Sequence, residues 1–548
     1  MNKFHKYILL LFVAGAITFS CDGIEDSLVS TELEENPLPP TPEYSSGSAD
    51  FSKYVAVGNS LTAGFMDGAL YTAGQNNSIP AILSAQFQAA GGVAINQPDV
   101  NSANGFNSSL SDVGNGLIFG RTELDTDIPG PVPTTGEFPI PDFTGSRSEI
   151  TNFGVPGIRV ADLFSTDLAG NAALGLYYSR FASSPGSSTI IADAAAASPT
   201  FFSLWIGNND VLQYALSGGI SEALITSQGD FQNDFGNALG ALVQTGAKGV
   251  VVNIPPIVVL PFFRAVPWNV IALDEATAGQ LNAGLSSVND AINACASPLV
   301  GLIDEEDAAR RNINYSVGPN PILAIDEELT DLGPCFDALQ GAGQIDAQAR
   351  AQLVPYEQSR PMAAGELVLL TAGAVLNTPF GDDPAKPIGV VIPLGFNADG
   401  SLEGDKFYLT QAEQANIVTA RATFNAVIDG VIAATNDNIG ATNVVLADLH
   451  PTLADLFGLD VATATQLALS TDSRDAMFAD GELGLSVSGV TLMPTFGPDG
   501  VFSTDAVHPN PRGYALISNE IITTIETAFG ASLPRATVLN YPSVVIAQ

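Results

Sequence analysis

Five short apolar runs constrain the fold most strongly. They lie at 53–58, 150–153, 199–206, 249–254 and 443–448, and each one stops at a Gly, Pro or Asp. Helix-like stretches lie between them. Strands that are apolar throughout are buried on both faces, which is typical of a parallel sheet covered by helices. We therefore predict a parallel sheet of about five strands between two layers of helices, with the ligand site beyond the carboxyl ends of the strands.

Helical patterns accompany these runs. The predicted helices lie at 230–245, at 274–294, from the capping box of Thr410 and Glu413 to about 434, and from Pro511 to Gly530. Residues 97–147 are rich in Gly, Asn, Pro and Asp and are interpreted as a long excursion from the core. Residues 298–405 show little regular pattern, so we interpret them as an insertion with short strands such as 388–392.

The first 20 residues have the layout of a secretory signal, with Lys3 and Lys6 before an apolar run too short to span a bilayer. Cys21 follows directly. The segment resembles a bacterial lipoprotein signal, in which this Cys carries the lipid; an ordinary cleaved signal with an incidental Cys is the alternative. The acidic residues after Cys21 resemble the surface-export signals of Bacteroidetes lipoproteins. We expect an exported protein that is lipid-anchored to the cell envelope at the outer membrane, either at the cell surface or in the periplasm.

The charge balance excludes two classes of partner. The 548 residues include 58 Asp and Glu against 19 Lys and Arg, a net charge of −39. Such a chain repels phosphate, so we predict no nucleic-acid partner and a membrane contact only through the N-terminal lipid.

The two remaining cysteines, Cys295 and Cys335, can pair in an oxidising compartment or stay as buried thiols. Neither has a His or Cys at metal-ligand spacing, so we predict no metal site.

Histidine is scarce outside the predicted signal. Only His450 and His508 remain, so any imidazole base is one of these two. Asp505 lies three residues before His508 and can accept the ring Nδ1–H, which leaves Nε2 facing outward. Alone, this spacing is common at helix caps and on surfaces. His450 follows the fifth apolar run, but its spacing from Asp448 is less favourable, so we expect a structural or rim role for it.

Three predicted strand ends carry residues that complete such a site. Ser60 follows the first run and supplies a hydroxyl, although a Ser there can equally cap a helix. Gly157 follows the second run, and its backbone N–H can approach an oxyanion closely. Asn209 follows the third run, and its amide can donate to the same oxygen. Gly and Asn are common turn residues, so the prediction depends on the set and not on any one member.

Four motifs stand in the order found in the SGNH/GDSL hydrolases. They are Gly-Asn-Ser-Leu at 58–61, Asn-Phe-Gly-Val-Pro-Gly at 152–157, Gly-Asn-Asn-Asp at 207–210 and Asp-Ala-Val-His at 505–508. The chain thus resembles this family of GDSL-like lipases and acylhydrolases over roughly 51–300 and 405–530. The resemblance implies a three-layer α/β/α sandwich with a flavodoxin-like sheet. It also implies ester hydrolysis through an acyl-enzyme, with no cofactor.

The resemblance also implies roles for single residues. They are Ser60 as nucleophile, His508 as base, Asp505 as its orienter, and an oxyanion hole from the Ser60 N–H, Gly157 and Asn209. One position departs from the family pattern, because Asn59 stands where Asp is usual. If that Asp only orders the turn by hydrogen bonds, Asn59 can replace it; if its charge tunes the site, activity is reduced. We favour the first reading, since Asp505 already supplies a carboxylate.

The expected organisation is a signal peptide at 1–20, a Pro- and Ser-rich acidic tether at 21–50, and a hydrolase domain at 51–297 and 406–548 with the insertion 298–405 within it.

The expected substrate is a small-molecule, lipid or glycan ester. A lipase-like role predicts an apolar cleft rim, with Phe201-Phe202 and Phe262-Phe263 as candidates unless they lie in the core. A carbohydrate deacetylase needs aromatic platforms for the sugar, and the chain has only two Trp, Trp205 and Trp268. A non-catalytic surface binding lipoprotein on the same scaffold is the third reading.

Overall fold

The computed structural model describes residues 43–127, 130–298, 300–374, 376, 379–380, 383–387, 404–458 and 484–547. The predicted signal, Cys21 and most of the predicted tether lie outside the described residues, as does the predicted strand at 388–392. The fold described below is that of the unit 45–548.

Five parallel strands form the central sheet, as the apolar runs predict. In chain order they are β1 (Tyr54–Gly58), β4 (Asn152–Gly154), β5 (Phe201–Trp205), β6 (Lys248–Val252) and β15 (Val444–Ala447). Across the sheet their order is β15-β6-β5-β1-β4. This is the flavodoxin-like order, in which the winding reverses beside the first strand. A ligand site is therefore expected beyond the carboxyl ends of β1 and its neighbours.

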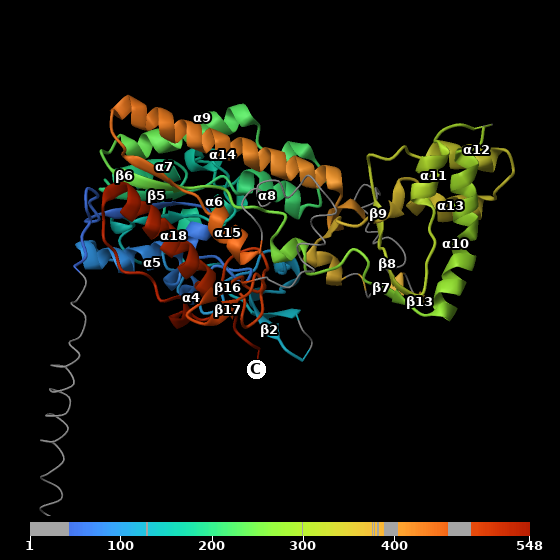
Figure 1. The fold of residues 1–548 in the computed structure, drawn as a ribbon, viewed down its shortest axis with the longest axis horizontal. Helices are drawn as coiled ribbons and strands as arrows, with labels where there is room; N and C mark the ends of the chain where they lie inside the picture. Colours follow the sequence, from blue (N-terminus) through green and yellow to red (C-terminus); the bar gives the residue numbers. More distant parts are fainter. Residues whose placement is uncertain are drawn as a thin grey trace, which may run out of the picture. The chain divides into compact units, whose positions relative to one another are not determined.

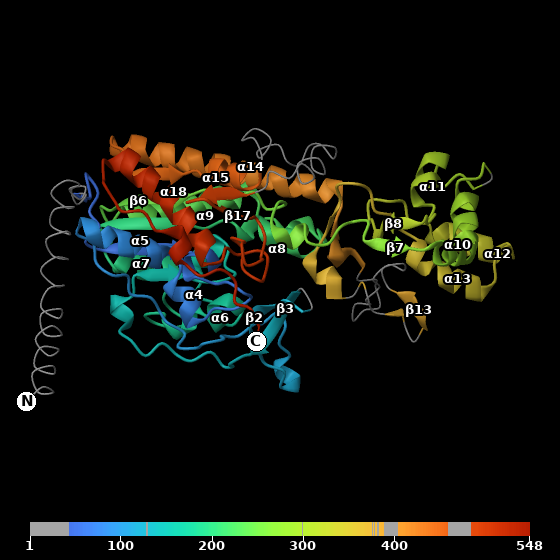
Figure 2. The ribbon, with the colours of Figure 1, turned by 60° about the horizontal axis from the view of Figure 1, so that its bottom comes forward.

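Helices cover both faces of this sheet and give the three layers predicted from the sequence (Figures 1 and 2). One layer contains α7 (Ile190–Ala196), α8 (Asn209–Leu216), α9 (Gln228–Val243) and α14 (Gln411–Ile439), and the other contains α5 (Ile79–Phe87) and α18 (Pro511–Phe529). Side chains alternate between the layers along each strand. Val55 and Val57 pack toward the first layer, whereas Tyr54 and Ala56 pack toward the second.

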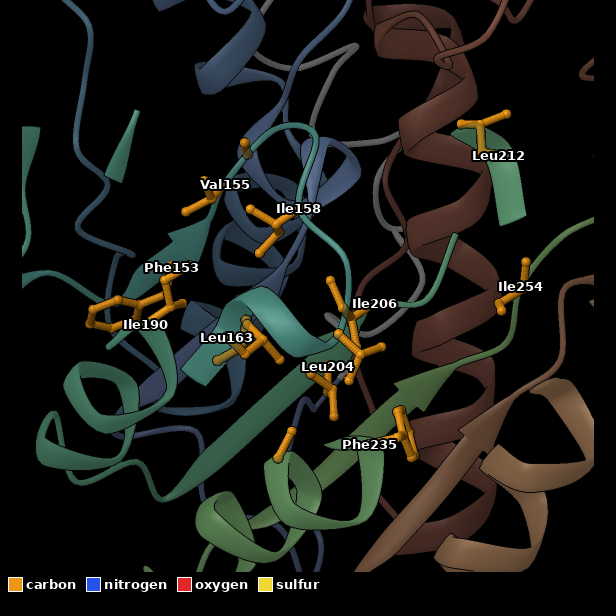
Figure 3. Packing of buried hydrophobic residues seen from close by; sticks show 14 of the residues in the cluster. Phe153, Val155, Ile158, Leu163, Ile190, Leu204, Ile206, Leu212, Phe235 and Ile254 are labelled. Carbon is orange, nitrogen blue, oxygen red and sulfur yellow. The ribbon is translucent and has the colours of Figure 1, made fainter. Parts of the chain in front are cut away.

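The core on the α9 side holds the end of β5 in place. Figure 3 shows Leu204 and Ile206, at that end of the strand, among other buried side chains that include Phe235 of α9. Phe231 of α9 and Phe424 of α14 stack with their ring centroids 4.1 Å apart. This packing fixes the position from which the third sequence motif, at 207–210, leaves the sheet.

Helix α14 begins at the predicted capping box. The Thr410 side chain accepts from the Glu413 N–H, and the Glu413 carboxylate accepts from the Thr410 N–H at 2.6 Å. By length and composition it is the one described helix that could cross a membrane. However, Ile417, Phe424 and Ile428 on one of its faces are buried against the α8–α9 layer and the sheet. We therefore assign α14 to the core of the domain.

Most of the described residues between 266 and 408 form a lobe with its own hydrophobic cluster, whereas Leu367 and Leu369 join the core beneath α14. Its elements are β7 (Ile271–Leu273), α10 (Glu275–Cys295), α11 (Glu305–Arg311), β8 (Gly318–Asn320), β9 (Leu323–Ile325), α12 (Gly333–Gly341), α13 (Ala347–Leu353), β10 (Ser359–Pro361), β11 (Leu367–Val368), β12 (Pro379–Phe380), β13 (Asp383–Pro387) and β14 (Tyr408–Leu409). A disulfide joins Cys295 to Cys335. Helix α10 matches the helix predicted at 274–294, but its apolar stripe packs in this lobe and not on the sheet. Residues on both sides of 298, where the insertion is expected to begin, therefore pack in the hydrophobic cluster of the lobe.

Short elements surround the carboxyl edge of the sheet. They are α3 (Ser60–Ala63), α4 (Thr72–Asn76), the hairpin β2 (Phe119–Asp125) and β3 (Gly130–Thr135), α6 (Ala172–Leu176), α15 (His450–Leu456) and the hairpin β16 (Leu485–Val487) and β17 (Val490–Leu492). The β2–β3 hairpin lies in the excursion at 97–147, where the sequence predicts no strand. Pro131 and Pro133 in β3 hide the strand pattern, since Pro is depleted from strands and tolerated only at their edges.

Candidate active site

Ser60, His508 and Asp505 form one chain of hydrogen bonds. Nε2 of His508 lies 2.9 Å from Oγ of Ser60, and Nδ1 lies 2.9 Å from Oδ2 of Asp505. An ionised carboxylate only accepts, so Nδ1 carries the ring proton and Nε2 is free to accept from the serine. The Phe65 ring lies 5.0 Å from the imidazole ring. The fold thus brings the serine after β1 to the Asp-x-x-His turn before α18, in the arrangement of nucleophile, base and orienter.

Four hydrogen bonds hold the Asp505 carboxylate. Oδ1 accepts from the backbone N–H of Val507 at 2.9 Å and of His508 at 2.8 Å. Oδ2 accepts from the Gly68 N–H at 3.1 Å, besides the imidazole. Burial alone raises the pKa of Asp505, but the charge and hydrogen bonds of His508 and the backbone donors lower it to about 2. Asp505 is therefore ionised throughout the physiological pH range.

The Gly68 contact lies beside a set of hydrogen bonds around Asp67 that no sequence motif indicates. Asp67 is 4% exposed and has a φ of 56°. Its carboxylate accepts from the Tyr71 hydroxyl at 2.6 Å and from the Thr504 N–H at 3.0 Å. These hydrogen bonds connect the turn after α3 to the loop that carries Asp505. The only sequence signal for them is the Asp-Gly pair at 67–68, which is typical of turns in general.

Asn59 makes two hydrogen bonds that order the turn at Ser60. Its Oδ1 accepts from the Leu61 N–H at 3.1 Å and caps α3, while its Nδ2 donates to Oδ1 of Asn208 at 3.1 Å. The side chain is 1% exposed. Both halves of the amide are therefore used within the protein, which supports the reading in which this position orders the turn.

The predicted oxyanion donors lie on neighbouring loops. Nδ2 of Asn209, at the start of α8, donates to the Ile158 carbonyl at 2.8 Å and so ties the end of β5 to the loop of Gly157. The Ser60 N–H lies in the first turn of α3, where no intrahelical acceptor exists. Ser60, Asn209 and His508 line one cavity, whereas Gly157 is solvent-exposed and lies outside that lining.

The cavity at Ser60 is predominantly apolar. Its polar side chains are those of Ser60, Asn208, Asn209, Thr452 and His508. The apolar ones come from α3, β5, α8, the loop 255–260, α15 and the residues that flank it, β16, the loop 501–509 and α18. The described part of the chain contains no group of three or more His, Cys, Asp or Glu side chains that could hold a metal ion.

The aromatic pairs proposed for a cleft rim do not line this cavity. Phe201 and Phe202 are fully buried in β5, where the two faces of the sheet are both covered by helices. Phe263 is buried and Phe262 packs against the same core. Trp205, in contrast, is both buried in β5 and part of the cavity lining. Most of the lining residues carry no motif, so no sequence signal identified them.

Comparison with known proteins finds a matching family. The model of the family described as GDSL-like Lipase/Acylhydrolase matches residues 54–316. This span contains the first three motifs and ends before Asp505 and His508, which the fold brings back to Ser60. No curated protein and no solved structure matched the chain. Residues 54–316 belong to the family of GDSL-like lipases and acylhydrolases, which makes the chain an ester-hydrolysing enzyme.

Proposed function

We propose that the enzyme hydrolyses carboxylic esters of aliphatic acids through an acyl-enzyme on Ser60. The observation that carries this proposal is the position of His508, which bridges Ser60 and Asp505 in the wall of an apolar cavity. A hydroxyl is a weak nucleophile until a neighbouring base removes its proton. The imidazole is held for that task by a carboxylate that remains ionised.

The reaction follows in two halves. Nε2 of His508 takes the Ser60 proton as Oγ bonds to the ester carbonyl carbon, and the carbonyl π electrons move to oxygen. The tetrahedral intermediate collapses when the bond to the alcohol breaks, and the imidazolium gives its proton to the departing oxygen. Water then attacks the acyl-enzyme in the same way, which releases the acid and restores Ser60. Asp505 stabilises the imidazolium in both halves without taking its proton.

The oxyanion is stabilised by the Ser60 N–H, by the Asn209 amide and by the Gly157 N–H. One Asn209 N–H is engaged by the Ile158 carbonyl, which holds the amide in place while the second N–H remains for the oxyanion. Donors that are already oriented cost no reorganisation during the reaction, and the loss of one typically costs about 10²–10³ in kcat. Asn209→Ala should show a loss of this size.

The acyl chain occupies the apolar cavity. Each buried methylene contributes about 0.8 kcal/mol, or roughly a fourfold gain in affinity. We therefore expect kcat/KM to rise along the series of p-nitrophenyl esters from acetate toward a longer acyl chain, until the cavity is filled.

The deciding experiment measures this ester series with the wild type and with Ser60→Ala. The proposal expects turnover by the wild type and none by the variant. Activity confined to acetate would instead favour a deacetylase on the same site. If neither protein turns over, labelling of Ser60 by a fluorophosphonate decides between an enzyme with a more specialised ester and a non-catalytic binding protein, which would remain unlabelled.

We also propose that the enzyme is exported and anchored through a lipid on Cys21. The signal-like segment before this residue supports the proposal, and the disulfide between Cys295 and Cys335 fits an oxidising compartment. Mass spectrometry of the mature N-terminus tests it: lipidated Cys21 in the membrane fraction is expected, and Cys21→Ser should abolish both the modification and the membrane association. An unmodified mature chain would refute the anchor.

A further inference from the structure

A second Asp–His pair lies at the same edge of the sheet and takes no part in the mechanism above. Oδ1 of Asp448, directly after β15, lies 2.7 Å from Nδ1 of His450. Nε2 of His450 does not face a hydroxyl. It is hydrogen-bonded to the guanidinium of Arg421, which reaches the pair from α14.

Arg421 is a buried cation without a carboxylate in direct contact among the described residues. It is 2% exposed, and its Nε has no hydrogen-bond partner in the described part of the chain. Burial lowers the pKa of Arg421 to about 10, and the charge of Asp448 opposes that change. A buried charge is costly unless it is paired. Because a guanidinium only donates, the imidazole must present an unprotonated Nε2 and direct its Nδ1–H to Asp448.

Further contacts tie this cluster to two segments of the sheet edge. Asn253, directly after β6, donates from Nδ2 to Asp448 at 2.6 Å and accepts the Leu449 N–H on Oδ1 at 3.0 Å. Asn425 of α14 binds both the N–H and the carbonyl of Ile254, at 2.8 Å and 3.0 Å. Side chains of α14 thereby hold both the loop after β6 and the turn into α15.

These two segments form one wall of the apolar cavity. Pro255, Pro256 and Ile257 line it from the loop after β6, and Leu449 and Leu453 line it from the start of α15. Helix α15 is only seven residues long, and no side-chain cap is present at its N-cap residue. The Arg421–His450 contact is therefore the link through which α14, whose inner face is buried in the core, fixes the first turn of this wall.

We propose that Arg421 and His450 are positioning residues that hold the α15 wall of the cavity and thereby set the enzyme's preference for longer aliphatic acyl groups. This inference rests on the proposed ester hydrolysis at Ser60. The two residues act through the wall and do not touch the reacting atoms. Replacing either residue should weaken the contacts between the wall and the distal carbons of a long acyl chain. Acetate has no such carbons, so its hydrolysis should change little.

The test is the ratio of kcat/KM for p-nitrophenyl decanoate to that for p-nitrophenyl acetate. Both values scale with the folded fraction of the protein, so the ratio is insensitive to a loss of stability. Each methylene that loses its contact with the apolar wall lowers kcat/KM about fourfold, so the loss of contact to two methylenes lowers it by more than about tenfold. We expect His450→Ala to lower the ratio by at least about tenfold. His450→Gln should restore most of it, because an amide can donate to Asp448 and accept from Arg421.

Asn436→Ala is the matched control. Asn436 lies on the same helix and binds Asn443 and Val444 through its side chain, at the amino end of β15 and away from the cavity. It should lower stability and leave the ratio unchanged. The inference is overturned if His450→Ala keeps the wild-type ratio, or if Asn436→Ala lowers it equally.

Binding of decanoate, measured by calorimetry on the Ser60→Ala background, separates this inference from the proposed reaction. Decanoate should bind, and adding His450→Ala should raise its Kd at least about tenfold. If neither ester is hydrolysed but this shift is seen, the role of His450 in the wall stands, and the labelling of Ser60 decides the proposed reaction separately. A background protein that does not bind decanoate, or an unchanged Kd, overturns the inference.

Discussion

Replacing Asp505 with Asn tests the proposed mechanism most directly, because the contacts of the carboxylate dictate how the amide must lie. Oδ1 accepts two backbone N–H groups, and Oδ2 accepts one together with the imidazole. The single oxygen of Asn therefore takes the place of Oδ1, and its NH₂ group faces Gly68 and His508. Nδ1 of His508 must then accept, so the ring proton moves to Nε2 and points at Ser60. The base is lost although the shape of the site is preserved.

The size of the effect follows from these contacts. An imidazole held in the wrong tautomer loses about 10⁴ in kcat in comparable serine hydrolases. The Gly68 N–H is left without its acceptor, which costs about 1–3 kcal/mol of stability. A pKa of about 2 for Asp505 against an ordinary value of 3.8 corresponds to a further stabilisation of about 2 kcal/mol. This contribution is present above about pH 4 and is lost as the pH falls toward 2, so the variant should show little of that acid sensitivity.

The assay is kcat with the best p-nitrophenyl ester, together with urea unfolding at pH 7. Asp193→Asn is the control, since Asp193 of α7 accepts comparable hydrogen bonds from Tyr178 and Ser183 without approaching Ser60. It should lose stability and keep kcat. Retention of more than about a tenth of wild-type kcat by Asp505→Asn would refute the role of Asp505, because a tautomer effect is expected to be about a thousand times larger.

Three further outcomes are expected. Reducing the disulfide between Cys295 and Cys335, which are 40 residues apart, should destabilise the lobe by about 4 kcal/mol in urea while acetate hydrolysis persists, because the lobe has its own core. Burial raises the pKa of Glu413 to about 8, so wild-type stability should fall as the pH rises from about 4.5 to 8, and Glu413→Gln should flatten this slope in thermal melts. Asn59→Asp keeps the cap on α3, and a flip of the Asn208 side-chain amide lets its NH₂ group donate to the new carboxylate. We expect kcat to change less than about threefold, and a tenfold loss would contradict the ordering role.

The strands and the helix ends could be predicted because they depend on local chemistry. Each apolar run coincides with a strand to within two residues at either end, and the capping box of Thr410 and Glu413 begins α14 as predicted. The sequence also predicts that the first three motifs lie close together, because parallel strands deliver their carboxyl ends to one edge. Gly58, Gly154 and Trp205 are paired side by side there.

The walls of the cavity could not be predicted, because an apolar stripe shows which face is buried and not what buries it. The stripe of α10 packs in the lobe, although its pattern fits a sheet-covering helix equally well. Leu453 of α15 and Ile517 of α18 meet in one cavity from segments far apart in the chain. Asp67 likewise acts through contacts to the loop of Asp505, which no local pattern indicates.

The two Asp–His pairs show why a short motif does not define a catalytic base. In both pairs the carboxylate holds Nδ1, so the two imidazoles present the same unprotonated Nε2. The difference lies in the group that Nε2 faces. Ser60 can give up its proton once an oxyanion hole stabilises the product of attack, whereas Arg421 keeps its proton at any pH at which the enzyme works. We therefore propose that the same pair supports chemistry beside Ser60 and positions a cavity wall beside Arg421, so that the tertiary partner decides its role.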